Sequence, residues 1–273
     1  MWTPAARAQL AREDLPYATC LTDAEWAVVA PFMPQPSKVG RPWARPMRLV
    51  FDGVLYVLRT GCAWAHLPRD LPPPGTVHRW FLRLARSGAF EAMMRVLTAL
   101  DRARAGRDPL PTAAAVMDAQ AARSGTVGVA GQRGYDPARR VVGRKRHALV
   151  DTGGRLLGAS VSRASLHDSR AGIGLLRASR KPWPFLQRCF ADSAYAGERV
   201  GTATAIAVTV VSAELGQKGF AVQPQRWVAE RSFAHAGRCR RLARDHETTD
   251  DAALGFFVLA NAMLLVRRLA REL

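Results

Sequence analysis

Ala113-Ala114-Ala115-Val116-Met117-Asp118 is the stretch on which the predicted fold rests, because a short apolar run ends in a single carboxylate. Bounded apolar runs of this length are typical of strands buried in a sheet. The pattern returns in Cys189-Phe190-Ala191-Asp192. Side chains at the ends of such strands project into a crevice outside the sheet. Asp118 and Asp192 can therefore share a metal ion if the two strands are neighbours.

Three further strands are expected around these two. His147–Asp151 and Leu156–Val161 flank Thr152-Gly153-Gly154 as a hairpin, and Ile206–Val211 is the last strand. The expected helices are Asp168–Ser179, about Gln225–Arg244, and about Asp250–Arg271. This order predicts an α/β fold, a mixed five-stranded sheet flanked by helices.

The first hundred residues read as helices. Thr22 caps one helix, Pro46 opens a strongly apolar one, and Gly61 ends it as a left-handed cap. After the turn Pro72-Pro73-Pro74-Gly75, Thr76 is expected to cap the next helix. We therefore expect two regions, a helical one at 1–105 and a sheet domain at 106–273.

The helix after Thr76 has two faces. Its apolar side chains recur at helical spacing and predict a core face: Val77, Trp80, Phe81 and Leu84. Arg79, Arg83 and Arg86 lie on another face. A helix, a turn and an arginine-striped helix are compatible with a helix-turn-helix that presents its second helix to DNA. An ordinary solvated charged face explains the pattern equally well.

The charge balance points to a polyanionic partner. The chain carries 40 Lys and Arg against 22 Asp and Glu, a net charge of +18 in 273 residues. Arginine dominates these cations, and its planar fork suits phosphate. Nucleic acid is the expected partner, although a basic composition alone gives the same count.

Other compositional features give less information about function. The four cysteines are far apart and suggest neither a zinc site nor a disulfide framework. The N-terminus lacks the apolar core of a secretory signal. The longest apolar run, Ala252–Val266, is too short to span a bilayer and reads as a core helix. We expect a cytoplasmic protein, associated with the nucleoid and not with a membrane.

Glu230 is the third candidate acid. Its place between Trp227 and Ala234 suggests that it points at least partly inward, and it is the single acid on a helix rich in arginine. Three carboxylates can hold two divalent ions for phosphodiester chemistry without Cys or His. Each acid taken alone is more simply read as a turn cap or a structural ion pair.

Several segments in fixed order resemble the DDE insertion-sequence transposases, in the group named after insertion sequence five. They cover nearly the whole chain from about Leu21. The segments are Leu21–Trp26, Tyr56–Trp64, Asp118-Ala119-Gln120, Gly134-Tyr135-Asp136, Gly143–His147, Ala191–Tyr195, and Arg226–Phe233 with Arg238–Leu242.

This resemblance implies a ribonuclease-H-like catalytic domain with Asp118, Asp192 and Glu230 as catalytic residues and metal ligands. It implies Mg²⁺, with Mn²⁺ able to substitute, and strand transfer at terminal inverted repeats. Double-stranded DNA, both repeat and target, is the implied partner, bound by a homo-oligomer. The DNA-binding cations are expected to be Arg79, Arg83, Arg86, Arg144, Lys145, Arg146, Arg226, Arg238 and Arg241.

Two alternatives stay open on the sequence. A metal nuclease of the same fold would cut DNA without joining it. A non-catalytic DNA-binding protein would keep the basic residues alone, and the presence of all three acids argues against it.

Overall fold

A computed structural model describes residues 12, 14–35, 45–111, 114–124, 132–195, 198–211 and 226–272. The first part of the chain is helical, as expected. Its elements are α2 (Asp23–Val29), η1 (Ala30–Phe32), α3 (Met47–Thr60), η2 (Trp64–His66), α4 (Pro74–Arg86) and α5 (Ala89–Arg104).

The second part forms a mixed sheet with helices around it. Its strands are β1 (Ala114–Arg123), β2 (Gly134–Asp136), β3 (Val141–Asp151), β4 (Leu156–Arg163), β5 (Arg188–Ala191) and β6 (Ala207–Val210). Its helical elements are α6 (Asp168–Arg180), η3 (Ser193–Tyr195), α7 (Glu198–Thr204), α8 (Arg226–Gly237), η4 (Arg240–Leu242), α9 (Asp250–Leu269) and η5 (Ala270–Glu272).

The predicted fold class is confirmed, with one strand more than expected. The strand order is β2-β3-β1-β5-β6, and β4 also pairs with β3. β1 runs antiparallel to β3 and parallel to β5. The additional strand is β2, a three-residue segment that pairs with the start of β3. Its brevity explains why no alternation in the sequence revealed it.

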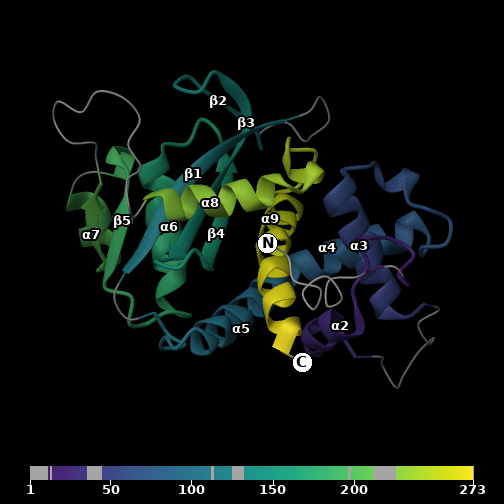
Figure 1. Cartoon of the computed structure of the whole chain (residues 1–273). Helices are drawn as coiled ribbons and strands as arrows, with labels where there is room; N and C mark the ends of the chain where they lie inside the picture. The colour runs from purple at the N-terminus through teal and green to yellow at the C-terminus, as the bar shows by residue number, and fades with distance from the viewer. Residues whose placement is uncertain are drawn as a thin grey trace, which may run out of the picture.

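The two faces of the sheet belong to different apolar clusters. Val116, Ala148 and Val150 pack with α8, α9 and the N-terminal helices. Their strand neighbours Met117 and Leu149 pack instead with α6. This alternation follows from the two-residue period of a strand. Figure 1 shows α8 across the front of the sheet and α9 between the sheet and the N-terminal helices.

Helix α9 is the centre of the larger cluster. It packs against α2, α4, α5, α8 and β4, so one helix touches both parts of the chain. In the described part of the chain it is the one helix long and apolar enough to cross a membrane, yet 72% of its most apolar window is buried inside the structure. The reading as a core helix is therefore confirmed.

An aromatic stack joins the N-terminal helices to α9. The ring of Phe256 lies 4.1 Å from that of Phe81 and 5.9 Å from that of Trp64, centroid to centroid, and both pairs are stacked. Phe81 and Phe256 are fully buried. The regions predicted at 1–105 and 106–273 thus share a core, and their boundary stays a prediction.

Local signals at helix ends account for the N-terminal elements. Thr22 and Glu25 form a capping box at the start of α2. Gly61 ends α3 with φ of 73°, a left-handed conformation. A Cβ on Gly61 would also lie 3.0 Å from the backbone of Arg240. Glycine is therefore required at this position for two separate reasons.

Two expected boundaries are wrong. Helix α4 begins at Pro74 with Pro73 as its cap, so Thr76 lies inside the first turn. Proline is favoured there because the first turn needs no N–H donor from it. The long helix expected at Gln225–Arg244 ends at Gly237. The chain then turns into η4, which carries Arg241 into the interior.

We predict that Phe256→Ala lowers the free energy of unfolding by about 3–5 kcal/mol, because it removes a fully buried ring from a stacked cluster. Urea denaturation of both proteins measures the difference. Val96→Ala, at an exposed position of α5, is the control and should change stability by less than about 0.5 kcal/mol. A loss of under about 1 kcal/mol for Phe256→Ala would contradict the central role of this stack.

Candidate active site

The register of β1 and β5 sets Asp118 and Asp192 side by side. The two strands are parallel, and Val116 pairs with Phe190. Two residues further along each chain come Asp118 and Asp192. Asp192 follows the last residue of β5, as predicted. Asp118 does not end its strand, because β1 continues to Arg123. The pairing of β1 with β5 ends earlier, at Val116.

Both acids belong to the sheet face that α8 covers. Val116 and Phe190 pack in the cluster that contains α8 residues. Their neighbours Met117 and Ala191 pack in the other cluster. Because side chains alternate along a strand, Asp118 lies on the α8 side, and Asp192 follows Phe190 by the same interval.

Backbone N–H groups orient the two carboxylates. Oδ1 of Asp118 accepts a hydrogen bond from the N–H of Ala119 at 2.8 Å. Oδ1 of Asp192 accepts one from the N–H of Ala194 at 3.0 Å. Both side chains are half-buried. Partial burial lowers the local dielectric and strengthens the attraction of a carboxylate pair for a cation.

The hydroxyl of Tyr195 is affected by the charges of both Asp118 and Asp192. Burial raises the pKa of its hydroxyl, and the negative charges of Asp168, Asp118 and Asp192 raise it further. Its hydroxyl is buried without a hydrogen-bond partner among the described residues. The phenol therefore stays protonated beside the carboxylates.

Glu230 takes a different position from the one expected. The buried residues of α8 are Val228, Ala229, Ser232, Phe233 and Ala236. Glu230 is exposed, so the expectation that it points inward is wrong. The stripe that faces the sheet leaves it on another side of the helix.

Two contacts fix α8 over the turn between β3 and β4. Arg231 donates from Nη2 to the carbonyl of Gly153 at 3.0 Å, and its guanidinium stacks 4.4 Å from the ring centroid of Trp227. The hydroxyl of Ser232 donates to the carbonyl of Gly154 at 3.2 Å. The helix that carries Glu230 is thus attached to the sheet by side chains next to it in sequence.

The donor set fits a divalent cation in part. Asp118 and Asp192 supply the hard oxygen ligands that such ions prefer. Within the described ranges, no three Asp, Glu, His or Cys residues gather closely enough to hold a metal ion. The structure thus brings together two of the three predicted acids, and the assignment of Glu230 stays a prediction.

Arg144, Lys145 and Arg146 are not a DNA-binding loop, and this expectation is wrong. They lie in β3, and all three side chains are buried. Arg144 pairs with Asp245 at 2.7 Å, and Lys145 pairs with Asp168 at 2.9 Å and Asp136 at 3.2 Å. Arg146 donates to the carbonyl of Leu242 at 2.8 Å. Buried charges need such partners, and these contacts occupy them.

The predicted DNA-binding cations near α8 include one buried side chain and one exposed one. Arg241 is buried, and its Nε lies 2.6 Å from Oε1 of Glu247, so its expected role in DNA binding is wrong. Arg238 is exposed and stays a candidate. The side chain of Arg226 lies outside the described residues.

The arginine stripe on α4 reaches solvent. Arg79, Arg83 and Arg86 are all exposed, while Val77, Phe81 and Leu84 are buried as predicted. Arg83 lies 4.9 Å from the ring centroid of Trp80. Exposed guanidiniums on one helix are available to phosphate. Their contact with DNA stays a prediction.

Sequence reasoning missed the ion cluster of Lys145, Asp136, Asp168 and Arg139. Asp168 begins α6 and shares Lys145 with Asp136 of β2. Arg139 lies 3.7 Å from Asp168 and 3.5 Å from Asp136. The signal that could have indicated it is the isolated Asp136 near a cation-rich segment. Its role is to hold β2 and α6 against β3.

Two family models match the chain. Residues 110–265 match the family described as "Transposase DDE domain". Residues 21–94 match the family described as "Putative transposase of IS4/5 family". No curated protein and no solved structure matches the chain significantly.

We predict that Arg144→Met lowers the free energy of unfolding by about 3–5 kcal/mol, because Asp245 would be left buried without its cation. Urea denaturation checks this. Arg83→Met, at an exposed arginine, should stay within about 0.5 kcal/mol of the parent protein. An Arg144→Met protein of unchanged stability but weaker DNA binding would restore the reading that the structure has overturned.

Proposed function

The chain belongs to the DDE transposases of the IS4/IS5 type, and on this basis we propose that it cleaves DNA at the terminal inverted repeats of an insertion sequence and joins the freed ends to target DNA. As a member of this family the protein is a DNA-binding polynucleotidyl transferase. The proposal adds the reaction steps, the ends on which it acts, and the metal.

The proposal rests on the positions of Asp118 and Asp192, each two residues beyond Val116 and Phe190, the last registered pair of β1 and β5. Two carboxylates on adjacent parallel strands, both half-buried and on the α8 side, form the core of a site for phosphodiester chemistry. Glu230 is proposed as the third acid because its helix packs on β1. Its exposed side chain would have to turn toward the aspartates to share an ion with them.

Members of this family use divalent metal ions, and we propose Mg²⁺, with Mn²⁺ as a substitute. Asp118, Asp192 and Glu230 would hold it. A bound divalent ion activates the attacking oxygen and stabilises the leaving oxygen of the phosphodiester. The protein's own contribution is orientation, since the N–H groups of Ala119 and Ala194 fix one oxygen of each aspartate.

The proposed DNA surface is smaller than the charge count suggests. Arg79, Arg83 and Arg86 on α4 and Arg238 after α8 are exposed. We propose that α4 contacts the phosphate backbone of the terminal repeat, in a homo-oligomer that also holds target DNA. A net charge of +18 favours attraction to DNA over long range. We propose a cytoplasmic location associated with the nucleoid.

We predict that Asp118→Ala, Asp192→Ala and Glu230→Ala each reduce metal-dependent cleavage of terminal-repeat DNA by more than about a hundredfold. Loss of groups that merely orient a ligand already costs ~10–100-fold. Cleavage and strand transfer are measured on labelled duplexes in Mg²⁺. DNA affinity should be retained in all three variants.

Asp23→Ala is the matched control, because Asp23 is an exposed carboxylate at the start of α2. It should cleave like the parent protein. Near-normal cleavage by Glu230→Ala would remove Glu230 from the site and leave the aspartate pair. Cleavage without joining would indicate a nuclease in place of a transposase.

We predict that Arg83→Ala weakens DNA binding by a similar factor on all sequences and lowers the slope of affinity against salt by about one. The reason is that an exposed guanidinium on α4 would contact one phosphate. Fluorescence anisotropy at several salt concentrations measures both quantities. Arg163→Ala, at an exposed arginine of β4, is the control. An unaltered salt slope for Arg83→Ala would exclude this contact.

A further inference from the structure

A cavity of about 100 Å³ lies where α3, α8 and α9 meet. Its polar lining comes from Thr19, Arg59 of α3, His235 of α8, Arg238 and Arg267 of α9. Apolar side chains such as Leu58 and Met263 form the remaining walls. None of the predicted catalytic acids lines it.

The charge around this cavity is unbalanced. Three guanidiniums and an imidazole line it, and its lining contains no Asp or Glu among the described residues. The nearby carboxylate, Glu25, lies 3.7 Å from Nε of Arg267 and also pairs with Arg12. Burial lowers the pKa of Arg267; the charge of Glu25 raises it in part, and the positive charges of Arg12 and Arg59 lower it again. The arginines therefore repel one another across a partly dry space.

Three buried polar atoms of the lining lack a hydrogen-bond partner within the described ranges. They are Oγ1 of Thr19, Nδ1 of His235 and Nε of Arg267. Each of these atoms can act as a donor. Most buried polar groups in folded proteins are hydrogen-bonded. Three atoms without a hydrogen bond around one cavity, one of them held only by the long ion pair with Glu25, therefore indicate a missing acceptor.

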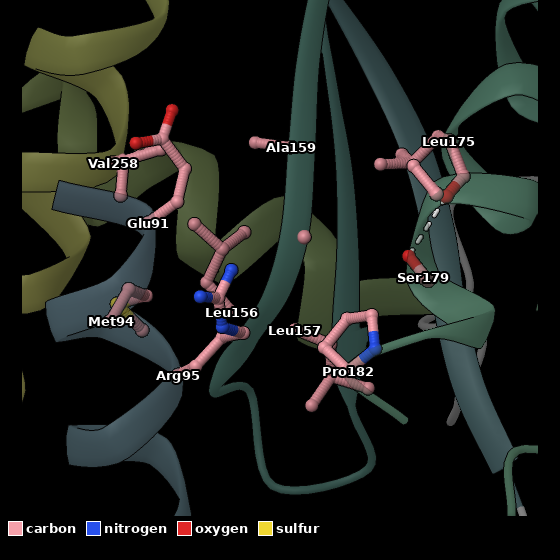
Figure 2. A pocket seen from close by; sticks show the side chains of 12 residues that line it. Glu91, Met94, Arg95, Leu156, Leu157, Ala159, Leu175, Ser179, Pro182 and Val258 are labelled. Carbon is pink, nitrogen blue, oxygen red and sulfur yellow. Dashed lines mark hydrogen bonds between the residues drawn. The ribbon is translucent and has the colours of Figure 1, made fainter. Parts of the chain in front are cut away.

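A second cavity offers a comparison within the same chain. It measures about 140 Å³ and lies between α5, β4 and α6 (Figure 2). Arg95 lines it, but Glu91 does as well, so its lining holds charges of both signs. The lining of the first cavity therefore differs from this one in carrying positive charge without a carboxylate.

We propose that the cavity formed by Thr19, Arg59, His235, Arg238 and Arg267 binds a phosphate group. A tetrahedral oxyanion presents several acceptor oxygens at once, and forked guanidiniums suit it. The volume equals that of several water molecules, which admits a phosphate group but no nucleobase with it. Bound there, the anion would join α3 to α8 and α9.

The phosphate group has two possible sources, free orthophosphate or the backbone of bound DNA. The exposed Arg238 gives the cavity a positive edge at the surface through which either could enter. The chemistry of recognition is the same for both. The proposal is independent of the cleavage reaction, because it concerns residues outside the aspartate site.

The first experiment uses orthophosphate and the full chain. Thermal unfolding is followed in sodium phosphate and in sodium chloride of equal ionic strength, and calorimetric titration gives the dissociation constant. Phosphate at about 100 times that constant should raise Tm by ~5–10 °C. No difference between phosphate and chloride overturns the proposal.

Variants then assign the binding to this cavity. Arg59→Gln should weaken phosphate binding about tenfold or more, because it removes a charged donor. Thr19→Val removes an unpartnered hydroxyl, so it should fold as well as the parent and also bind phosphate more weakly. Arg95→Gln, in the other cavity, is the matched control and should bind normally. Normal phosphate binding by both Arg59→Gln and Thr19→Val refutes the assignment.

A final arm separates the two sources. If the anion belongs to DNA, orthophosphate should compete with a terminal-repeat duplex, and Thr19→Val should weaken duplex binding. If the anion is free orthophosphate, duplex affinity should be equal in Thr19→Val and the parent. Both results apply only if the orthophosphate titration shows binding. That titration is the measurement that decides the proposal.

Discussion

The burial of α9 is the constraint on which the rest of this molecule depends. Its side chains pack against the N-terminal helices on one side and against β4 and α8 on another. Apolar residues around most of its circumference make this possible, because a helix that is hydrophobic all round is stable only inside a protein. The sheet that carries Asp118 and Asp192 and the helix that carries the exposed arginines are consequently parts of one packed body.

The sequence predicted the fold class well, and it also indicated where Asp118 and Asp192 lie in the sheet, for a local reason. Apolar runs that end in Asp118 and Asp192 are visible without knowledge of the fold, and pairing of β1 with β5 needs only one register to bring them together. The extent of β1 beyond Asp118 was not visible, since Ala119–Arg123 lacks a strong strand pattern. The direction of Glu230 was misjudged because α8 gives a weak amphipathic signal.

Cations were the least predictable part of the chain. Residues 143–147 have the composition of an exposed basic loop, yet Arg144, Lys145 and Arg146 are buried in β3. Their partners are remote in sequence, as Asp245 lies about a hundred residues after Arg144. A local sequence pattern cannot predict an ion pair between residues so far apart in the chain. A count of charges also does not distinguish buried cations from exposed ones. The exposed stripe on α4 was predictable because its apolar residues defined the opposite face.

Gly61 has a consequence for how this chain tolerates mutation. Its left-handed backbone and its approach to Arg240 disfavour any side chain, so the end of α3 and the start of η4 lie in close contact at this glycine. Any replacement would separate those elements and shift Arg241, whose guanidinium donates to the carbonyl of Cys62 next to this glycine. Substitutions are therefore restricted at Gly61, although this glycine lies outside the proposed catalytic site.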